Sequence, residues 1–362
     1  MLLRIPDFYD SFRCIADQCT DTCCVGWEID IDEKSLKRYT TLKSDFGNII
    51  RQNIEDGHFK LIEGDRCPFL RQDGLCDMIC HLGDSSLCDI CREHPRFVEV
   101  YGDIMEKGLG LCCEEAVRLL LNAKGNAHSP IAFVEREIND EPDDIPDDAR
   151  EARDAILDER NHLFKILADH ARPLNERLVE LIDFAVETSG IELSDINGNS
   201  DNISNNILQS WIDCLGKGES FGPAWDQAYK ELSQIAHTPR ANGTSSIGQS
   251  SGLITPSDGE KIIAYLLFRY YAKSLFDGNS LTKVQFALYF WIMLQKFGDI
   301  FAKTAEMPCA DNSANTLTAK IAAVKLLSKQ TEYSEEIMNI LEQEFMENPL
   351  FSPENFKKVI MS

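Results

Sequence analysis

Apolar residues along most of this chain recur every three or four positions, which is the spacing of one face of an α-helix. The clearest early example covers residues 33–54, where Leu36 and Tyr39 begin the series. Asp32 stands just ahead of it and is a residue type that caps helix N-termini. We therefore predict a helix over 33–54 capped by Asp32, and a second helix that begins near Glu114.

From residue 148 onward the pattern is helical almost throughout, and Pro173 and Pro256 suit the first turns of helices. No stretch alternates with period two for long enough to indicate a substantial sheet. The predicted fold is mainly α, with a loop-rich N-terminal cysteine and metal module over residues 1–130 followed by an all-helical domain over 131–362. The predicted helices of that domain are 148–170, 173–188, 204–216, 223–237, 257–277, 281–305, 314–330, 334–347 and 353–360.

Two segments interrupt this pattern. Residues 135–159 contain twelve acids and three arginines and include Pro142 and Pro146, so we interpret them as an exposed acidic linker that runs into a helix. A landing surface for a lysine-rich partner is the alternative interpretation. Residues 238–255 are rich in Gly and Ser and indicate a flexible loop.

Charge narrows the possible partners. The 362 residues carry 60 acidic and 36 basic side chains, a formal net charge of −24. Nucleic-acid binding needs clustered Lys and Arg, so this balance argues against it and favours basic partners. The longest apolar runs, such as 262–268, are too short to span a bilayer. The first residues lack the apolar stretch of a signal peptide, so we expect a cytoplasmic protein that does not enter the membrane.

Cysteines are concentrated at the N-terminal end of the chain, where eleven of the 13 lie within the first 113 residues. This density indicates either a disulfide framework or a metal site, and a reducing cytoplasm favours metal. Thiolate ligands suit zinc or an iron–sulfur cluster. The side chains of adjacent cysteines diverge, so a pair such as Cys23–Cys24 indicates one ligand and one packed or second-site thiol.

The cysteines form an ordered series of motifs. CIADQCTDTCCVGWEIDID begins at Cys14, CPFLRQDGLC begins at Cys67, LCDICREHPR contains Cys91 and LCCEEA contains Cys113. In this order the motifs closely resemble those of the bacterial flagellin lysine-N-methylase family. The segments AYLLFRYYAKSLFDG and VQFALYFWIM also resemble the helical half of that family. The resemblance therefore covers most of the chain.

The resemblance implies which cysteines bind metal. Five cysteines have no counterpart in the family pattern: Cys80, Cys88, Cys112, Cys214 and Cys309. Glu114 stands where the family usually has proline, and His94 stands where an aromatic residue is common. The metal-binding cysteines that the resemblance implies are Cys14, Cys19, Cys23, Cys24, Cys67, Cys76, Cys91 and Cys113.

The resemblance also implies a reaction, the transfer of a methyl group from S-adenosylmethionine to lysine side chains of flagellin, with a [4Fe–4S] cluster required. The chain has no G-x-G-x-x-G motif after a strand and no C-x3-C-x2-C run, so the donor must bind in another way. Spacing alone does not separate zinc from iron–sulfur. Zinc therefore stays an alternative at the main site, and a separate four-thiolate zinc site is possible at Cys76, Cys80, Cys88 and Cys91.

Lysine methylation needs a neutral amine, although the pKa of free lysine is about 10.4. Burial or a nearby base must therefore supply the deprotonated form. Glu115 is the leading candidate for that base, because the resemblance retains it beside Cys113. The other candidates are Glu28, Asp30 and Asp32, which also suit exposed or capping positions.

Three further residues are candidates for binding the cofactors. Arg92 and Arg96 follow Cys91 and could stabilise an anionic cluster or pair with the donor carboxylate, unless they pair with local acids. Trp27 could stack on adenine or pack in the core. A C-terminal aromatic series at helical spacing is either core or a groove for a flagellin segment: Phe268, Tyr270, Tyr271, Phe286, Tyr289, Phe290 and Trp291.

The leading hypothesis is therefore a lysine-N-methylase that depends on a [4Fe–4S] cluster. The alternative from another class is a non-enzymatic zinc- or iron–sulfur-binding module that recognises a basic protein. A third possibility is a role in electron transfer or redox sensing.

Overall fold

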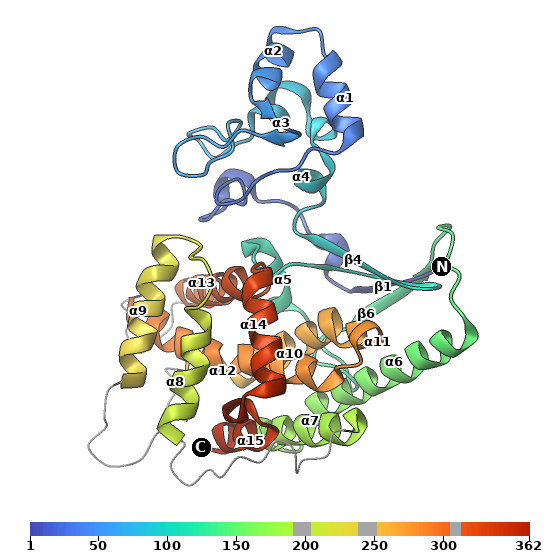
Figure 1. Cartoon of the computed structure of the whole chain (residues 1–362), viewed down its shortest axis with the longest axis vertical. Coiled ribbons are helices and arrows are strands. Elements are labelled where there is room, and N and C mark those ends of the chain that lie inside the picture. Colours follow the sequence, from blue (N-terminus) through green and yellow to red (C-terminus); the bar gives the residue numbers. More distant parts are fainter. Residues whose placement is uncertain (191–203, 238–251, 305–312) are drawn as a thin grey trace.

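A small lobe stands on a larger body in the computed structural model, which describes residues 1–190, 204–237, 252–304 and 313–362. Residues 13–95 form the lobe, called the cysteine lobe below, and the body carries the sheet and the longer helices (Figure 1). Each part has its own hydrophobic core. The N-terminus lies at the sheet and the C-terminus at the far end of the body (Figure 1).

The cysteine lobe contains short elements joined by loops. They are α1 (Glu33–Thr41), α2 (Asp45–Gln52), β2 (Ile54–Glu55), β3 (His58–Phe59), α3 (Asp77–Leu82) and α4 (Asp89–Glu93). The predicted capping by Asp32 is confirmed, because its carboxylate accepts a hydrogen bond from Ser35 N at 2.8 Å. The single helix predicted over 33–54 is wrong. The backbone is extended at Leu42, and the Ser44 side chain caps a second helix by accepting from Gly47 N.

A four-stranded mixed sheet joins the two parts of the molecule. Its strands are β1 (Leu2–Pro6), β4 (Arg96–Tyr101), β5 (Ile104–Leu109) and β6 (Phe133–Glu137), in the order β4-β5-β1-β6. β1 runs parallel to β5, and the other pairs are antiparallel. This sheet was not predicted, because its strands are short and come from distant segments. On β5 the buried face includes Glu106, a charged residue that hides the alternation of apolar residues.

The body is built from helices, which confirms the mainly α prediction. The helix predicted over 257–277 is divided, since α10 ends at Tyr270 and a 3-10 turn leads into α11. A capping box between Thr255 and Asp258 starts α10. The body helices are α5 (Glu114–Asn122), α6 (Asp147–Ala168), α7 (Leu174–Ser189), α8 (Ser204–Leu215), α9 (Pro223–His237), α10 (Pro256–Tyr270), α11 (Ser274–Asp277), α12 (Ser280–Thr304), α13 (Ser313–Thr331), α14 (Glu335–Glu347) and α15 (Pro353–Met361).

The two segments predicted to be linkers differ in outcome. Residues 135–159 run into a helix as predicted, because α6 begins at Asp147, but the first residues of this segment belong to β6, which extends to Glu137. The helix predicted over 148–170 is confirmed by α6, whose buried face carries arginines, such as Arg160, that pair with acids. Of the loop predicted over 238–255, residues 238–251 lie outside the described residues, and so does Cys309.

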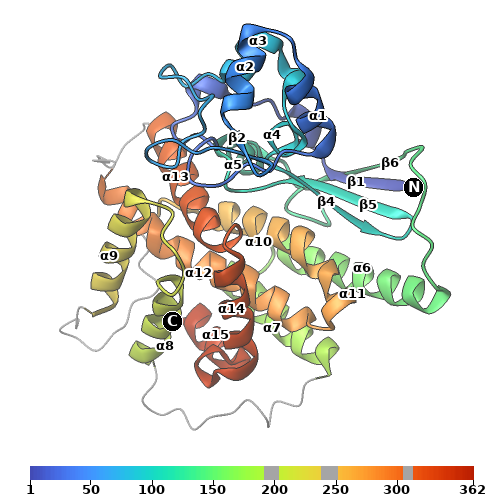
Figure 2. The ribbon, with the colours of Figure 1, turned by 45° about the horizontal axis from the view of Figure 1, so that its top comes forward.

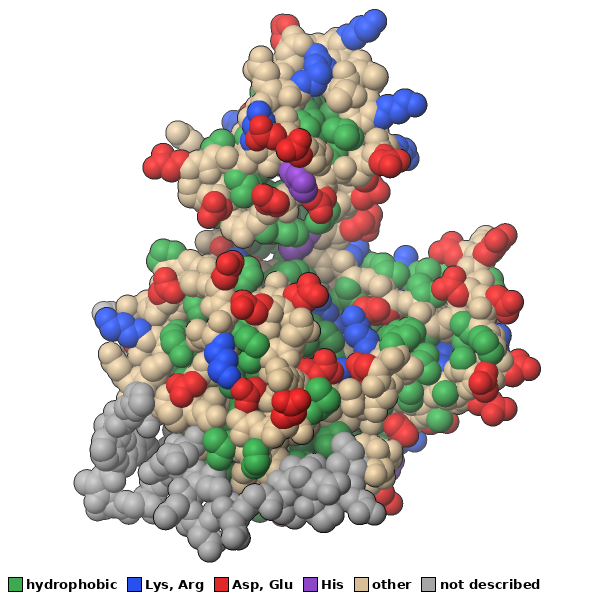
Figure 3. All heavy atoms as spheres, viewed as in Figure 1, with side chains coloured by type: hydrophobic (Ala, Val, Ile, Leu, Met, Phe, Trp, Pro, Cys, Tyr) green, Lys and Arg blue, Asp and Glu red, His purple; other side chains and the backbone are tan. Residues whose placement is uncertain are grey.

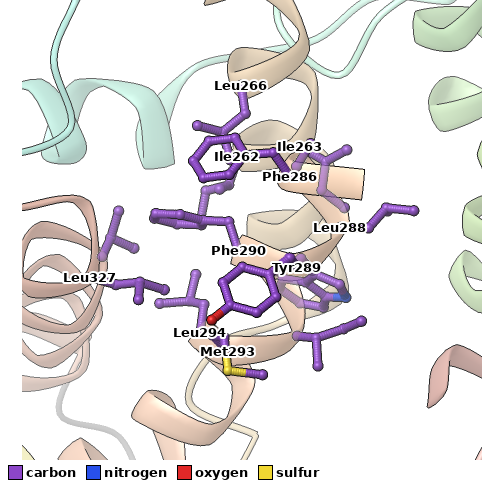
Figure 4. Close-up of a cluster of buried hydrophobic side chains, with 14 of the residues drawn as sticks. Ile262, Ile263, Leu266, Phe286, Leu288, Tyr289, Phe290, Met293, Leu294 and Leu327 are labelled. Atoms are coloured by element: carbon purple, nitrogen blue, oxygen red, sulfur yellow. The ribbon is translucent and has the colours of Figure 1, made fainter. Parts of the chain in front are cut away.

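The body core surrounds α12, which packs against α7, α10 and α13. Figure 4 shows side chains of α10 and α12, such as Ile263 and Phe290, packed together with Leu327 of α13. All seven residues of the C-terminal aromatic series are buried, so the core interpretation is confirmed. Within the described ranges, no helix is long and apolar enough to cross a bilayer.

Two buried polar contacts attach the sheet to the helices. Arg160 of α6 and Glu106 of β5 form an ion pair in which both side chains are at most 2% exposed, with N–O distances of 2.5 and 2.8 Å. The hydroxyl of Tyr265 on α10 donates to Leu109 O at 2.6 Å and accepts from Leu109 N at 2.5 Å. These contacts hold the end of β5 in place, just before Cys112 and Cys113.

Candidate metal centre and substrate cavity

A cavity of about 710 Å³ lies where the cysteine lobe meets the body. The space-filling view shows the narrow waist at this junction (Figure 3), and Figure 2 shows α5 and α13 at the end of the body beneath the lobe. Lys329 of α13 and Tyr333 line the body side. All eleven N-terminal cysteines line the cavity: Cys14, Cys19, Cys23, Cys24, Cys67, Cys76, Cys80, Cys88, Cys91, Cys112 and Cys113.

Four of these thiols lie where the lobe faces α5, and we call them the junction thiols: Cys14, Cys19, Cys23 and Cys113. The thiol of Cys113 lies near those of Cys14 and Cys19, and the thiol of Cys23 lies near those of Cys14 and Cys113. Burial raises the pKa of Cys113 to about 11, although backbone amides at the start of α5 oppose this shift. The junction thiols therefore include residues from both the lobe and the body.

Five other thiols lie inside the lobe, and we call them the lobe thiols: Cys24, Cys67, Cys76, Cys88 and Cys91. Burial raises the pKa of Cys67 to about 12, and the neighbouring thiols of Cys24, Cys76 and Cys88 add to the shift. Cys91 lies near Cys88, Cys24 and Cys67. Cys67 is 6% exposed and Cys88 is fully buried. Cys88, which has no counterpart in the family pattern, thus lies among cysteines that do.

The two groups meet at one dipeptide. The thiols of Cys23 and Cys24 are hydrogen-bonded to each other, which lowers the pKa of Cys24 to about 6 and raises that of Cys23. The described cysteines are free thiols. Sequence reasoning assigned one member of this pair to a second site, and the structure places the two thiols in different groups.

These thiols are the donors that the cavity offers to a metal. In the described part of the chain, no three Cys, His, Asp or Glu side chains already converge closely enough to hold one ion. The donors nevertheless fit zinc or an iron–sulfur cluster in type and number, since each group offers at least four thiols around a common space. Binding requires the side chains in a group to turn toward a shared centre.

The three residues predicted to bind cofactors all line the cavity. Arg92 is exposed and forms ion pairs with Asp89 and Glu93. The Arg96 guanidinium lies 5.0 Å from the centroid of the Phe12 ring. Trp27 is half-buried; its indole N–H donates to Cys23 O at 2.5 Å, and its ring lies 5.3 Å from that of His94. The structure therefore brings Arg92, Arg96 and Trp27 to the same space as the thiols.

Glu115, predicted to be the catalytic base, lies elsewhere. It is not among the cavity-lining residues, its side chain is 5% exposed, and its carboxylate pairs with Arg118 on the same helix, with an Nε–Oε2 distance of 2.6 Å. A catalytic role for Glu115 stays a prediction that no contact with the cavity supports. The acid that approaches the thiols is Glu114, whose Oε2 accepts from Cys19 at 3.7 Å.

Two lysines of α13 were not found by sequence reasoning. Lys329 pairs with Asp21 at 2.5 Å, while Lys325, only 8% exposed, lies 3.5 Å from Asp21 and 3.7 Å from Glu114. Burial raises the pKa of Asp21, but the hydrogen bond and charge of Lys329 outweigh it and leave the pKa below its usual value. These lysines hold the loop of Cys19 against the body. The two lysines lie about 300 residues from Asp21 in the sequence, so no local pattern around the cysteines indicated their contact.

An aromatic corner forms the other side of the cavity. The ring of His94 lies 6.2 Å from that of Tyr333, and its Nε2 lies 4.0 Å from Cys112 Sγ. Burial, together with the charge of Lys329, lowers the pKa of His94 to about 4, so the ring is neutral at pH 7. Trp27, His94 and Tyr333 thus line the cavity with uncharged rings from both the lobe and the body.

Comparison with known proteins gives a match to the flagellar biosynthetic protein FliU of Salmonella muenchen, with 32% identity over 127 residues that cover 75% of that protein and 32% of this chain. The chain belongs to the same family as this flagellar biosynthetic protein. Lysine-N-methylases of Salmonella typhimurium and Salmonella choleraesuis match at 32% identity over 127 residues, a span of only 32% of their length and 32% of this chain. No protein-family model matches the chain. No solved structure matches it either.

Proposed function

We propose that this protein is a lysine-N-methylase that transfers a methyl group from S-adenosylmethionine to lysine side chains of flagellin, in the cytoplasm. The observation that carries the proposal is the thiol-lined cavity in a chain that is similar to two lysine-N-methylases and to a flagellar biosynthetic protein. A cavity of about 710 Å³ falls in the size range of small-molecule sites. It therefore has room for a donor molecule and one lysine side chain.

The proposal includes a [4Fe–4S] cluster held by the junction thiols, with zinc as the alternative metal. Four thiols from both the lobe and the body surround that part of the cavity, and four cysteine thiolates are the usual ligands of such a cluster. A bound cluster would supply redox or Lewis-acid chemistry beside the donor. Lys325 and Lys329 lie close to Asp21 and Glu114, so they place positive charge near an anionic cluster.

In this proposal the cavity walls bind the donor. Arg96 pairs with the donor carboxylate, because its guanidinium lies at the wall and the structure gives it no carboxylate within ion-pair distance among the described residues. Trp27 offers the face of an indole to the adenine ring. Arg92 lies at the same wall, but it already pairs with Asp89 and Glu93. Arg96 is therefore the better candidate for the donor carboxylate.

The walls also favour the reactive form of lysine. Trp27, His94 and Tyr333 surround the space with uncharged rings, and Lys329 adds positive charge. Removal from water and a nearby like charge both lower the pKa of a lysine ammonium. The substrate amine then loses its proton, and its lone pair attacks the methyl group while the bond from methyl to sulfonium sulfur breaks. S-adenosylhomocysteine and methyl-lysine are the products.

The test uses anaerobically purified full chain with flagellin and methyl-labelled donor. We expect label on lysine, and a control with flagellin whose lysines have been chemically blocked should stay unlabelled. A brown protein with about four irons per chain supports the cluster. Absence of label on lysine under these conditions rejects the enzyme in favour of a non-enzymatic metal-binding module.

A further inference from the structure

One edge of the sheet is open. β4 forms this edge and runs from the base of the cysteine lobe toward the outer end of the sheet (Figures 1 and 2). Gly110 N donates to Pro95 O at 2.7 Å, one step before the first pair of the β4–β5 ladder. Bonded pairs alternate along an antiparallel ladder, so the N–H and C=O groups of Arg96, Val98 and Val100 point away from β5. In the described part of the chain these outward groups have no backbone partner.

The inner face of β4 is anchored to the body. The guanidinium of Arg269 lies 4.8 Å from the centroid of the Phe97 ring, and Glu99 pairs with Lys273 at 2.6 Å. Tyr101, at the end of the strand, is 2% exposed. These contacts hold β4 in its extended shape before any partner binds, so its open backbone groups are preorganised.

The two edges of the sheet differ in their side chains. At the β6 edge the exposed residues include Glu135, Arg136 and Glu137, and charged side chains protect an edge from pairing with another strand. On the outer face of β4 Val98 is 49% exposed and Val100 is half-buried, while the charged residues of β4 pair with the body or line the cavity. β4 is therefore the edge suited to accept an added strand.

The ends of β4 point to the kind of strand. At one end Pro95 and Arg96 line the cavity. At the other end the turn carries Gly102, whose carbonyl oxygen accepts from Asp143 N at 3.2 Å. Asp143 belongs to the stretch 139–148, which has six exposed acids and no Lys or Arg, and which lies between β6 and α6 (Figure 1). A six-residue strand separates the cavity from this acidic stretch by about 20 Å.

We propose that an extended, lysine-rich segment of the substrate protein adds to β4 as a further strand, with one lysine in the cavity and other basic residues against the acidic stretch. Main-chain hydrogen bonds to the open groups supply affinity, and alternate side chains of the segment pack on Val98 and Val100. That this segment is a methylation substrate rests on the proposed function, whereas strand addition does not.

Charge favours a basic segment over a second copy of this chain. Pairing of two copies through β4 would bring together two chains with a net charge of −24 each, and like charge opposes association. A lysine-rich segment instead meets the acidic stretch at one end of β4. The long-range field and the open edge therefore favour the same occupant.

The first test uses the full chain and a fluorescent peptide of about ten residues, in which valine and threonine alternate between lysines at both ends. We expect saturable binding that weakens as salt is raised, and at least about tenfold weaker binding of a matched peptide with glutamates at its ends. Bound peptide should slow hydrogen exchange in residues 96–101 but not in 133–137. Absence of binding, equal binding of both peptides, or slowed exchange only outside β4 overturns the proposal. So does a dimer of the chain alone that is paired through β4.

A matched pair of proline variants tests the edge. Val98→Pro removes an outward N–H and no ladder bond to β5, so the sheet is retained, and the peptide should bind at least about tenfold more weakly. Ile138 N donates to Met1 O, which places the N–H of Glu137 on the outside of β6, so Glu137→Pro is the same change at the other edge and should retain binding. Circular dichroism checks the fold. If Val98→Pro unfolds, Val98→Lys keeps the amide and should weaken binding by charge repulsion. Equal binding by the edge variants and the wild type overturns the proposal.

The acidic stretch and the reaction give separate readouts. Asp143→Asn with Asp144→Asn should weaken peptide binding about threefold, whereas Glu335→Gln with Glu336→Gln, at exposed acids of α14, should not. If Val98→Pro methylates flagellin as fast as the wild type at low substrate concentration, strand addition is wrong and the methylase proposal stands. If flagellin stays unmethylated while the peptide binds at β4, the methylase proposal fails alone.

Discussion

Cys23 and Cys24 are neighbours in the chain and hydrogen-bonded through their thiols, yet they belong to different thiol groups. Cys23 lies with Cys14 and Cys113 at the junction, whereas Cys24 packs against the core of the lobe. The two groups are therefore only one peptide unit apart at this point, and a metal bound by one group lies close to the other. This dipeptide joins the two thiol groups.

Loss of a junction thiol should abolish methyl transfer. We expect Cys113→Ser to lower the rate of flagellin methylation by at least about 100-fold, because removal of even a supporting contact to a metal costs 10–100-fold. Cys214, buried in the body core, is the control, and Cys214→Ser should retain the rate. Labelled-donor assays measure both rates. Equal losses in the two variants would contradict the assignment of the junction thiols.

Tyr265 and Tyr101 provide a matched pair of buried hydroxyls. The Tyr265 hydroxyl bonds both backbone groups of Leu109, whereas the Tyr101 hydroxyl has no hydrogen-bond partner in the described structure. We expect Tyr265→Phe to lower the free energy of unfolding by about 1–3 kcal/mol, and Tyr101→Phe to leave it unchanged or raise it slightly. Chemical denaturation measures both, and equal effects would be inconsistent with these contacts.

The ion pair between Arg160 and Glu106 should show strong coupling. Arg160→Met removes both hydrogen bonds of the buried Glu106 carboxylate to Arg160 and leaves it only the longer contact with Arg4 at 3.6 Å, so we expect a loss of about 3 kcal/mol in the free energy of unfolding. Glu106→Gln with Arg160→Met should lose less than the sum of the single changes. The exposed pair of Arg136 and Asp10 is the control, and Arg136→Gln should cost less than about 1 kcal/mol.

Lys329 should control how firmly the loop of Cys19 is held. Lys329→Met removes the 2.5 Å ion pair with Asp21, so backbone amides of residues 19–21 should exchange hydrogen faster. In this variant the pKa of Asp21 should rise toward its usual value. Lys217→Met breaks a pair with Glu344 away from the cavity and should leave exchange at residues 19–21 unchanged. Mass spectrometry of exchanged peptides gives the comparison.

The lobe should lose stability in acid through Asp32. Desolvation raises the pKa of this carboxyl, but hydrogen bonds that include those from the backbone N–H groups of Asp89 and Ser35 together outweigh it and hold the pKa at about 2. The unfolded chain, with an Asp pKa near 3.9, binds the proton more readily. The stabilisation is therefore complete above about pH 4 and is lost as pH falls toward 2.

The check on Asp32 is a comparison of acid unfolding. Asp32→Asn keeps a capping side chain but removes the ionisation, so its stability should change less than that of the wild type between pH 4 and 2. Asp56, for which no hydrogen bond or ion pair is found in the described structure, is a suitable site for the control Asp56→Asn. Identical acid profiles of Asp32→Asn and the wild type would contradict this role.

Local patterns were enough to predict the helices of the body, because a helix buries one face at a fixed spacing whatever it packs against. The prediction of a single helix over 33–54 was wrong because α1 and α2 bury their apolar faces in the same core. The backbone breaks at Leu42 and Ser44, but the spacing of apolar residues continues across the break. The sheet failed because pairing of β1 with β5 and β6 joins segments about 100 residues apart. The partner of a strand lies outside any local window.

Residue types and their order were enough to predict a thiol-rich region, because thiolate chemistry depends on which side chains are present. Only the tertiary structure divided those thiols, since Cys113 reaches the junction through the attachment of β5 to α10, and Cys88 reaches Cys67 through the packing of α4 on α1. In the same packed structure Glu115 lies away from the cavity, whereas Lys329 lines it. Distances between residues far apart in the chain are set by packing, which no local pattern records.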